Sequence, residues 1–196
     1  VGDPGLKCID RDMVNLALEN AELRRVVARR NIEGDAEFRA KVIADLGALW
    51  GTPTGRRLLR SIAASRHRVT ITPTRKPGGA NGMEYDKNLY ENRFWVNRSL
   101  ELTPTRGEGR PGSGCPSTIH YNPDRTSCGP KPWETRPPAI GLGHELGHAD
   151  QAARGIMLQG EAENDKRPDP EAPGRIPRIN ASELEAVGGP PYDGYA

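Results

Sequence analysis

The sequence predicts an α+β fold, in which a helical N-terminal part precedes a small sheet and one long buried helix. Three observations lead to this fold class. Apolar residues recur at helical spacing over residues 10–64, two short segments alternate polar and apolar residues, and a long helical pattern follows the prolines at 137 and 138. Of the 196 residues, 35% are hydrophobic, while 23 are glycine and 18 are proline. That composition fits a modest core wrapped in irregular loops.

The first third of the chain is predicted to be helical. One helix is expected over residues 10–30 and a second from residue 34 or 35 to residue 50, because apolar side chains recur every three to four positions in both. The Gly-Thr-Pro sequence at residues 51–53 should end the second helix. A third helix is expected over residues 54–64.

Two later segments have the alternating pattern of a half-buried strand. They cover residues 68–72 and 117–122, and each is followed or ended by a proline. The stretch between them, residues 75–115, is rich in loop-forming residues. Within it, residues 93–97 and 99–102 are candidates for short strands.

The clearest helical pattern covers residues 139–154. The preceding pair of prolines suits a helix start, and Gly155 is a plausible residue to end the helix. Residues 160–178 are charged and carry four prolines, so we expect an exposed loop. A short helix is predicted over residues 182–187.

The string Gly-His-Glu-Leu-Gly-His lies within this clearest helix. Residues four apart on a helix share a face, so His144 and His148 can direct imidazole nitrogens at one point, as zinc ligands do. Glu145 is then aimed beside that point. A carboxylate there can take a proton from the water that attacks in a hydrolytic site. The pattern predicts Zn²⁺ bound by His144 and His148, with Glu145 as the catalytic base.

The alternative is an ordinary helix that carries a polar pair by chance on a solvated face. Against it, the chain has only four histidines, and two of them fall at this spacing with a glutamate between them. The flanking residues are also apolar, which predicts a buried helix whose polar groups need a reason to be there. These apolar neighbours are Ile140, Leu142, Leu146 and Ala149.

A third protein ligand is required for such a zinc site. The extended motif with a further histidine does not fit, because Gln151 and Arg154 stand where it needs glycine and histidine or aspartate. A downstream acidic residue is therefore the better candidate, and the segment at 182–187 offers Glu183 and Glu185.

The choice between the two glutamates depends on helix capping. Ser182 and Glu185 form a capping box, which would occupy Glu185 and leave Glu183 free to turn inward. Asn180 and Glu183 offer a competing cap, so the capping argument alone does not decide. Glu183 is nevertheless the preferred third ligand. The alternatives are Glu185, His120, Glu161, Glu163 and Asp150.

Two further features allow more than one interpretation. His120 stands on the strand at 117–122, and an edge strand beside such a site can bind a substrate backbone by strand addition. The simpler interpretation is a surface or satisfied histidine. Cys115 and Cys128 bracket a short loop, which a disulfide could close outside a reducing cytosol. Unpaired thiols are the alternative.

The charge balance and the distribution of apolar residues argue against some classes of protein. The net charge of +2, with no concentrated basic stripe, argues against a nucleic-acid ligand. No apolar run approaches the roughly 18 residues of a membrane span, and no signal peptide is recognisable. Because the chain begins at Val1 without a methionine, we expect a domain cut from a longer protein or a processed form.

Three segments resemble the NleD-like family of bacterial effector zinc metallopeptidases. They are residues 112–123, 138–149 and 182–188. Similar domains are fused to the tips of type VI secretion spike proteins. The resemblance implies a zincin-like metallopeptidase fold with Zn²⁺ as cofactor. It implies His144, His148 and Glu183 as metal ligands and Glu145 as catalytic base.

The resemblance also gives expectations for partners and location. It implies a protein or peptide substrate, a delivery module and a cognate inhibitor, without nucleic acid or membrane. The protein is then secreted or delivered into a target cell, either the bacterial periplasm or a host cell.

We therefore expect an N-terminal helical segment at residues 1–50 and a zincin-like metallopeptidase domain at residues 51–196, packed as one unit. The predicted function is zinc-dependent hydrolysis of peptide bonds by an effector or toxin domain. The alternative is a zinc-stabilised, non-catalytic binding module of a secretion-system protein. A nuclease is a second rival, suggested by the basic stretch at residues 56–68.

Overall fold

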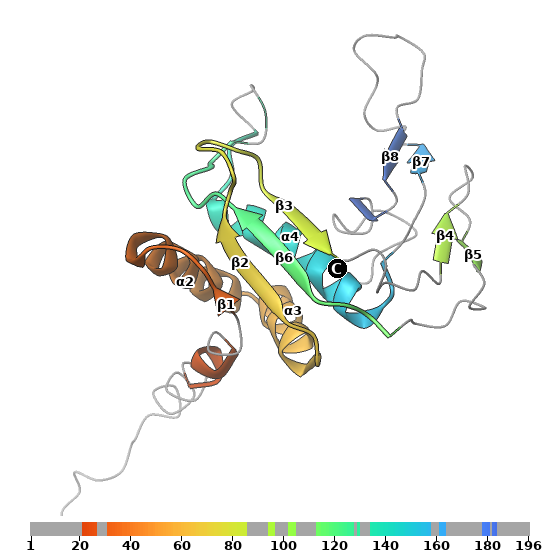
Figure 1. Cartoon of the computed structure of the whole chain (residues 1–196), viewed down its shortest axis with the longest axis horizontal. Coiled ribbons are helices and arrows are strands. Elements are labelled where there is room, and N and C mark those ends of the chain that lie inside the picture. The colour runs from red at the N-terminus through yellow and green to blue at the C-terminus, as the bar shows by residue number, and fades with distance from the viewer. Residues whose placement is uncertain are drawn as a thin grey trace, which may run out of the picture.

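The computed structural model has an α+β fold, as the sequence predicts (Figure 1). Of the first predicted helix it describes only residues 21–26, which are helical. The described residues are 21–26, 31–85, 94–96, 102–104, 113–127, 129, 134–157, 161–163, 178–180 and 182–183.

Two helices follow one another closely in the first half of the chain. Helix α2 (Ala36–Trp50) begins after Asp35, whose Oδ1 accepts a hydrogen bond from the backbone amide of Phe38 at 2.8 Å. Helix α3 (Pro53–Ala64) begins after Thr52, whose hydroxyl oxygen accepts a bond from the amide three residues on at 3.0 Å. Such caps satisfy amides that the first turn leaves unpaired. Both predicted helices are confirmed.

The main sheet has four strands in the order β1-β2-β6-β3 (Figure 1). Strands β1 (Asn31–Ile32), β2 (Val69–Pro73) and β6 (Ser117–Tyr121) are parallel, and β3 (Gly82–Tyr85) runs antiparallel beside β6. In β2 and β6 alternate residues are buried, because successive side chains of a strand point to opposite faces. The two strands predicted from alternation are confirmed.

The position of β6 corrects one hypothesis from the sequence. The strand that carries His120 lies inside the sheet between β2 and β3, so it is not an edge strand. Among the described strands β3 forms that edge, and the loop-rich pattern around it gave no sign of a strand. Its four residues Gly-Met-Glu-Tyr begin with glycine and show no full alternation, so pairing with β6 determines the strand.

Two small hairpins complete the described strands. β4 (Phe94–Val96) pairs with β5 (Leu102–Pro104), close to the two short strands predicted there, with the second shifted toward the C-terminus. β7 (Glu161–Glu163) pairs with β8 (Arg178–Asn180), where the sequence predicts an exposed loop. Residues 164–177 between them lie outside the described residues.

Helix α4 (Pro138–Arg154) lies against β6 and β3 and also contacts α2 and α3 (Figure 1). It begins with a proline in its first turn and ends at Gly155, which has a left-handed φ of 65°. This helix is confirmed as predicted. The expectation that Ile140 is buried is wrong, because its side chain is 52% exposed. The apolar core includes residues of α2, α3 and α4, of the helical segment at residues 21–26, and of the sheet.

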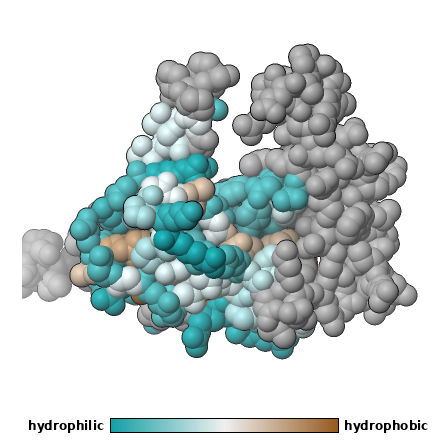
Figure 2. Space-filling model, turned by 45° about the horizontal axis from the view of Figure 1, so that its top comes forward, coloured by the Kyte–Doolittle hydropathy of each residue, from teal (hydrophilic) through white to brown (hydrophobic). Residues whose placement is uncertain are grey.

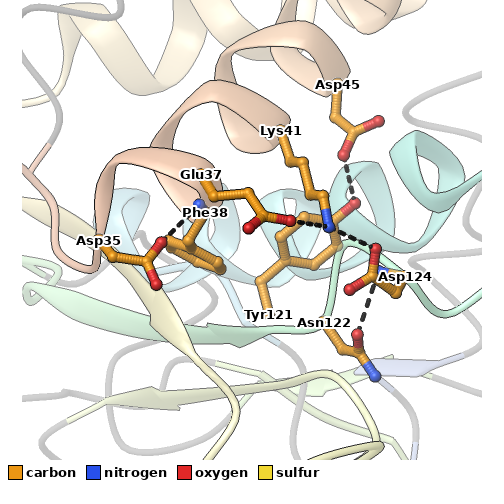
Figure 3. A network of polar contacts seen from close by, with 8 residues as sticks. All are labelled: Asp35, Glu37, Phe38, Lys41, Asp45, Tyr121, Asn122 and Asp124. Carbon is orange, nitrogen blue, oxygen red and sulfur yellow. Dashed lines mark hydrogen bonds and ion pairs between the residues drawn. The ribbon is translucent and has the colours of Figure 1, made fainter.

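Helix α2 is tied to the loop that follows β6 by a polar network (Figure 3). The Lys41 ammonium lies 3.0 Å from a Glu37 oxygen and 2.8 Å from an Asp124 oxygen. The hydroxyl of buried Tyr121 donates to Asp45 at 2.7 Å. Burial and this hydrogen bond raise the pKa of Tyr121. The network fixes the start of the loop that leads toward α4.

On the face shown in Figure 2, the described surface is mostly hydrophilic. Among the described residues, Ile43 and Ile140 are the large hydrophobic residues that are strongly exposed. No described helix combines the length and the apolar character that a membrane crossing needs.

The entry to β6 packs closely against the end of α4. The backbone amide of Cys115 donates to the carbonyl oxygen of Ala152 at 3.1 Å. The preceding residue, Gly114, has a φ of 72°, and a Cβ added there would lie 2.1 Å from the carbonyl oxygen of Ala153. Only glycine fits this close approach.

We therefore expect Gly114→Ala to lower the free energy of unfolding by roughly 2 to 5 kcal/mol, because left-handed strain and a steric clash add together. Gly78→Ala is the matched control. Gly78 has a φ of 71°, but nothing lies within 4 Å of its added Cβ, so roughly 1 to 2 kcal/mol should be lost. Urea denaturation measures both values. Equal losses would contradict the proposed clash.

Candidate metal centre

Helix α4 carries an unusual number of buried polar side chains. Glu145 is 8% exposed and His148 is 5% exposed, while Asp150 and Gln151 are fully buried. Burying charge is costly unless the group is paired. Asp150 is paired, because it accepts a hydrogen bond from the Ser61 hydroxyl at 2.7 Å and one from Arg154 at 3.3 Å. His148 has its partners in His144 and Glu183.

Two histidines and one glutamate converge at this place. The Nε2 atoms of His144 and His148 lie 3.2 Å apart. A carboxylate oxygen of Glu183 lies 3.0 Å from Nε2 of His144, and the other lies 3.3 Å from Nε2 of His148. All three side chains offer a ligand atom within 4.8 Å of the others. The structure thus brings together the three residues that the sequence singles out as ligands.

The spacing of these atoms fits a small tetrahedral ion. Four ligands at roughly 2.0–2.1 Å from a zinc ion lie about 3.3 Å from each other. The two Nε2 atoms are 3.2 Å apart, and each lies 3.0 or 3.3 Å from one of the two Glu183 oxygens. Two imidazoles and a carboxylate are a donor set that zinc accepts in catalytic sites. The residues present therefore fit a zinc ion and leave room for a fourth ligand.

Glu183 reaches the histidines from the segment after β8. Residues 182–183 are helical, and the Glu183 side chain is 39% exposed. Hydrogen bonds with His144 and His148 hold the pKa of Glu183 far below its usual range. Burial alone would lower the pKa of His148, but the hydrogen bond and charge of Glu183, with the charge of Glu145, raise it. The cluster thus contains an ionised carboxylate.

Glu145 differs from Glu183 in its surroundings. Burial raises the pKa of Glu145, although the charges of His144 and His148 oppose this effect. A buried carboxylate with a raised pKa is a better proton acceptor than an ordinary surface one. Its side chain lines the same cavity as the histidines. It can therefore exchange a proton with a molecule bound there.

The cluster opens into a cavity of about 600 Å³. One wall is formed by the edge strand β3 through Gly82, Met83 and Tyr85. Arg125 and Arg136 also line the cavity. Sequence reasoning missed all of these residues. The short strand and the two isolated arginines carry no local pattern, so no signal in the sequence could have placed them here.

Two of the other candidate ligands, His120 and Asp150, have partners outside the cluster. His120 lies with its Nε2 atom 3.3 Å from a Glu84 oxygen, and Asp150 is held by Ser61 and Arg154. Glu161 and Glu163 are on β7, whose side chains are not described. Glu185, the alternative third ligand, and Cys128, the second cysteine of the proposed disulfide, lie outside the described residues.

Comparison with known proteins gives one match. A family model described as Peptidase_M91, effector protein, matches residues 28–194 of the chain. No curated protein and no solved structure matches it.

We expect the purified protein to contain about one zinc ion per chain. Glu183→Ala and His148→Ala should lose the metal, because each removes one of three converging ligand atoms. Glu185→Ala is the matched control and should keep it. Elemental analysis by mass spectrometry measures all four proteins. Loss of zinc from Glu185→Ala but not from Glu183→Ala would mean that the third ligand is misassigned.

Proposed function

The chain belongs to the Peptidase_M91 family of effector proteins, and from this premise we propose that it is a zinc-dependent endopeptidase. His144, His148 and Glu183 hold the zinc ion, and Glu145 is the general base. The observation that carries this proposal is the convergence of three ligand atoms at tetrahedral spacing beside a buried carboxylate.

The proposed chemistry is hydrolysis of a peptide bond. When bound, zinc supplies a Lewis acid that polarises the scissile carbonyl and lowers the pKa of the attacking water. Glu145 accepts the proton of that water and delivers it to the leaving amine. Its raised pKa suits both steps, because the group must gain a proton and lose it again within one turnover.

The cavity supports a peptide as substrate. Strand β3 has β6 on one side and is the sheet edge among the described strands, and it lines the cavity next to the metal ligands. An extended peptide can pair with such an edge through backbone hydrogen bonds. The scissile bond of a peptide bound in this way lies over His144 and His148.

The family also supports a role as an effector. We propose that the domain is delivered into a target cell by a larger secretion module, and that a cognate inhibitor protects the producing cell. The target compartment is either the bacterial periplasm or a host cell. In each case a protein is cleaved rather than a nucleic acid, which agrees with the small net charge of +2.

The general base has a direct test. Glu145→Gln should lower kcat by about 10²- to 10⁴-fold and leave the zinc content unchanged, because Gln cannot accept a proton and residue 145 is not a ligand. Cleavage of denatured casein and metal analysis measure the two effects. Glu33→Gln is the matched control, since Glu33 follows β1 at the opposite end of the sheet order.

Two results would contradict this proposal. A Glu145→Gln protein that cleaves like the parent would exclude Glu145 as the base. A parent protein that binds zinc with a closed fourth position and cleaves nothing would favour the alternative, a zinc-stabilised binding module.

A further inference from the structure

Two arginines in the cavity have no role in the chemistry proposed above. Arg125 and Arg136 line it together with His144, Glu145 and Glu183. Among the described residues, none accepts a hydrogen bond from the side chain of Arg136, and its Nε atom is shielded from solvent without a partner. An unsatisfied buried donor is destabilising, and more so when it is charged. A ligand that enters the cavity could satisfy this guanidinium group.

The backbone holds both arginines in place. The amide of Arg136 donates to the carbonyl oxygen of Thr126 at 2.7 Å, and Ser127 pairs with Thr135 as an antiparallel bridge. The Nε atom of Arg125 donates to the carbonyl oxygen of Ser127 at 3.0 Å. Asp124, which precedes Arg125, is fixed to α2 by its ion pair with Lys41 (Figure 3). The arginines are therefore placed before any ligand binds.

The charges of the cavity leave these two arginines unbalanced. Its acidic residues are Glu145 and Glu183, and Glu183 lies against the two histidines. A zinc ion carries two positive charges, which these two carboxylates match. Among the described residues, neither Arg125 nor Arg136 forms an ion pair with a carboxylate, although the charge of Arg136 acts on Glu145 and lowers its pKa slightly against the effect of burial. The part of the cavity beside the metal centre is thus positive.

The position of Arg136 relates it to the scissile bond. A Cβ added at Gly141 would lie 3.3 Å from an Nη atom of Arg136, and Gly141 precedes His144 by about one helical turn, roughly 5 Å along the axis. An extended peptide advances about 3.3 Å per residue. A guanidinium at this position can therefore meet a substrate side chain within about two residues of the scissile bond.

We propose that Arg136, assisted by Arg125, binds an acidic side chain of the substrate within two residues of the cleaved bond. The protein is then selective for acidic peptides. Arginine suits this task because its planar group binds a carboxylate through two parallel hydrogen bonds. This inference rests on the proposed peptidase function and adds its substrate class.

The first experiment reads cleavage sites. A mixed peptide library made from a digested bacterial proteome is treated with the zinc-loaded parent, Arg136→Gln and Arg39→Gln, and the products are sequenced by mass spectrometry. Arg39 is the matched control because it is exposed on α2. We expect Asp and Glu to be enriched at one position near the bond cut by the parent and by Arg39→Gln. Arg136→Gln should lose the enrichment.

The second experiment uses a pair of peptides from that list that differ only by Glu or Gln at the enriched position. Arg136→Gln should lower kcat/KM for the Glu peptide by about tenfold or more and leave the Gln peptide nearly unchanged, because one charge-assisted contact is lost. Arg136→Lys should keep part of the preference. Binding of both peptides to the inactive Glu145→Gln protein, with and without Arg136→Gln, is followed by fluorescence anisotropy and should show the same difference.

Three outcomes would overturn the inference. The parent could cleave without acidic enrichment, or Arg136→Gln could keep the enrichment. An equal fall of kcat for both peptides would instead assign Arg136 to the reaction itself rather than to selectivity. If the zinc-loaded parent cleaves nothing in the library, the proposed function fails and this inference fails with it.

Discussion

The burial of α4 is the constraint on which the rest of the structure depends. The helix packs its apolar residues against the sheet and against α2 and α3, and the same burial encloses the polar groups between them. Each enclosed charge then needs a partner, since a lone one is costly in the interior. Asp150 finds Ser61 and Arg154 on one side. The histidines find Glu183 on the other.

The helix therefore has one face that holds Asp150 and another that holds the two histidines. The fold holds the helix through its apolar residues, so the histidine side chains need little ordering when a ligand arrives. Precise placement of catalytic groups on a rigid element lowers the cost of reaching the reactive geometry. The two glutamates of the site also differ because of their surroundings. Glu183 faces two imidazoles and has a depressed pKa, while burial raises the pKa of Glu145.

Local sequence was sufficient for α2, α3 and α4 and for the convergence of the two histidines on α4. Caps such as Asp35 and Gly155 act within a few residues, and the spacing of His144 and His148 is itself a local property. The strand β3 depends on pairing with β6 instead, and four residues without alternation cannot reveal it. Arg136 lines the cavity because the fold places the segment before α4 beside the metal cluster, and no local sequence pattern predicts this. The competing caps at Asn180 and Ser182 favoured Glu183 without deciding between the two glutamates, and the structure places Glu183 at the histidines.

The long sequence separation within the metal cluster has a further consequence. His144 and Glu183 are 39 residues apart, so an ion bound to both acts as a cross-link that closes a loop of this length. Closing a loop costs chain entropy, and this cost increases slowly with the length of the loop. The free energy of ion binding must compensate for it. Metal binding and the contact of Glu183 with the histidines of α4 are then coupled, so each favours the other.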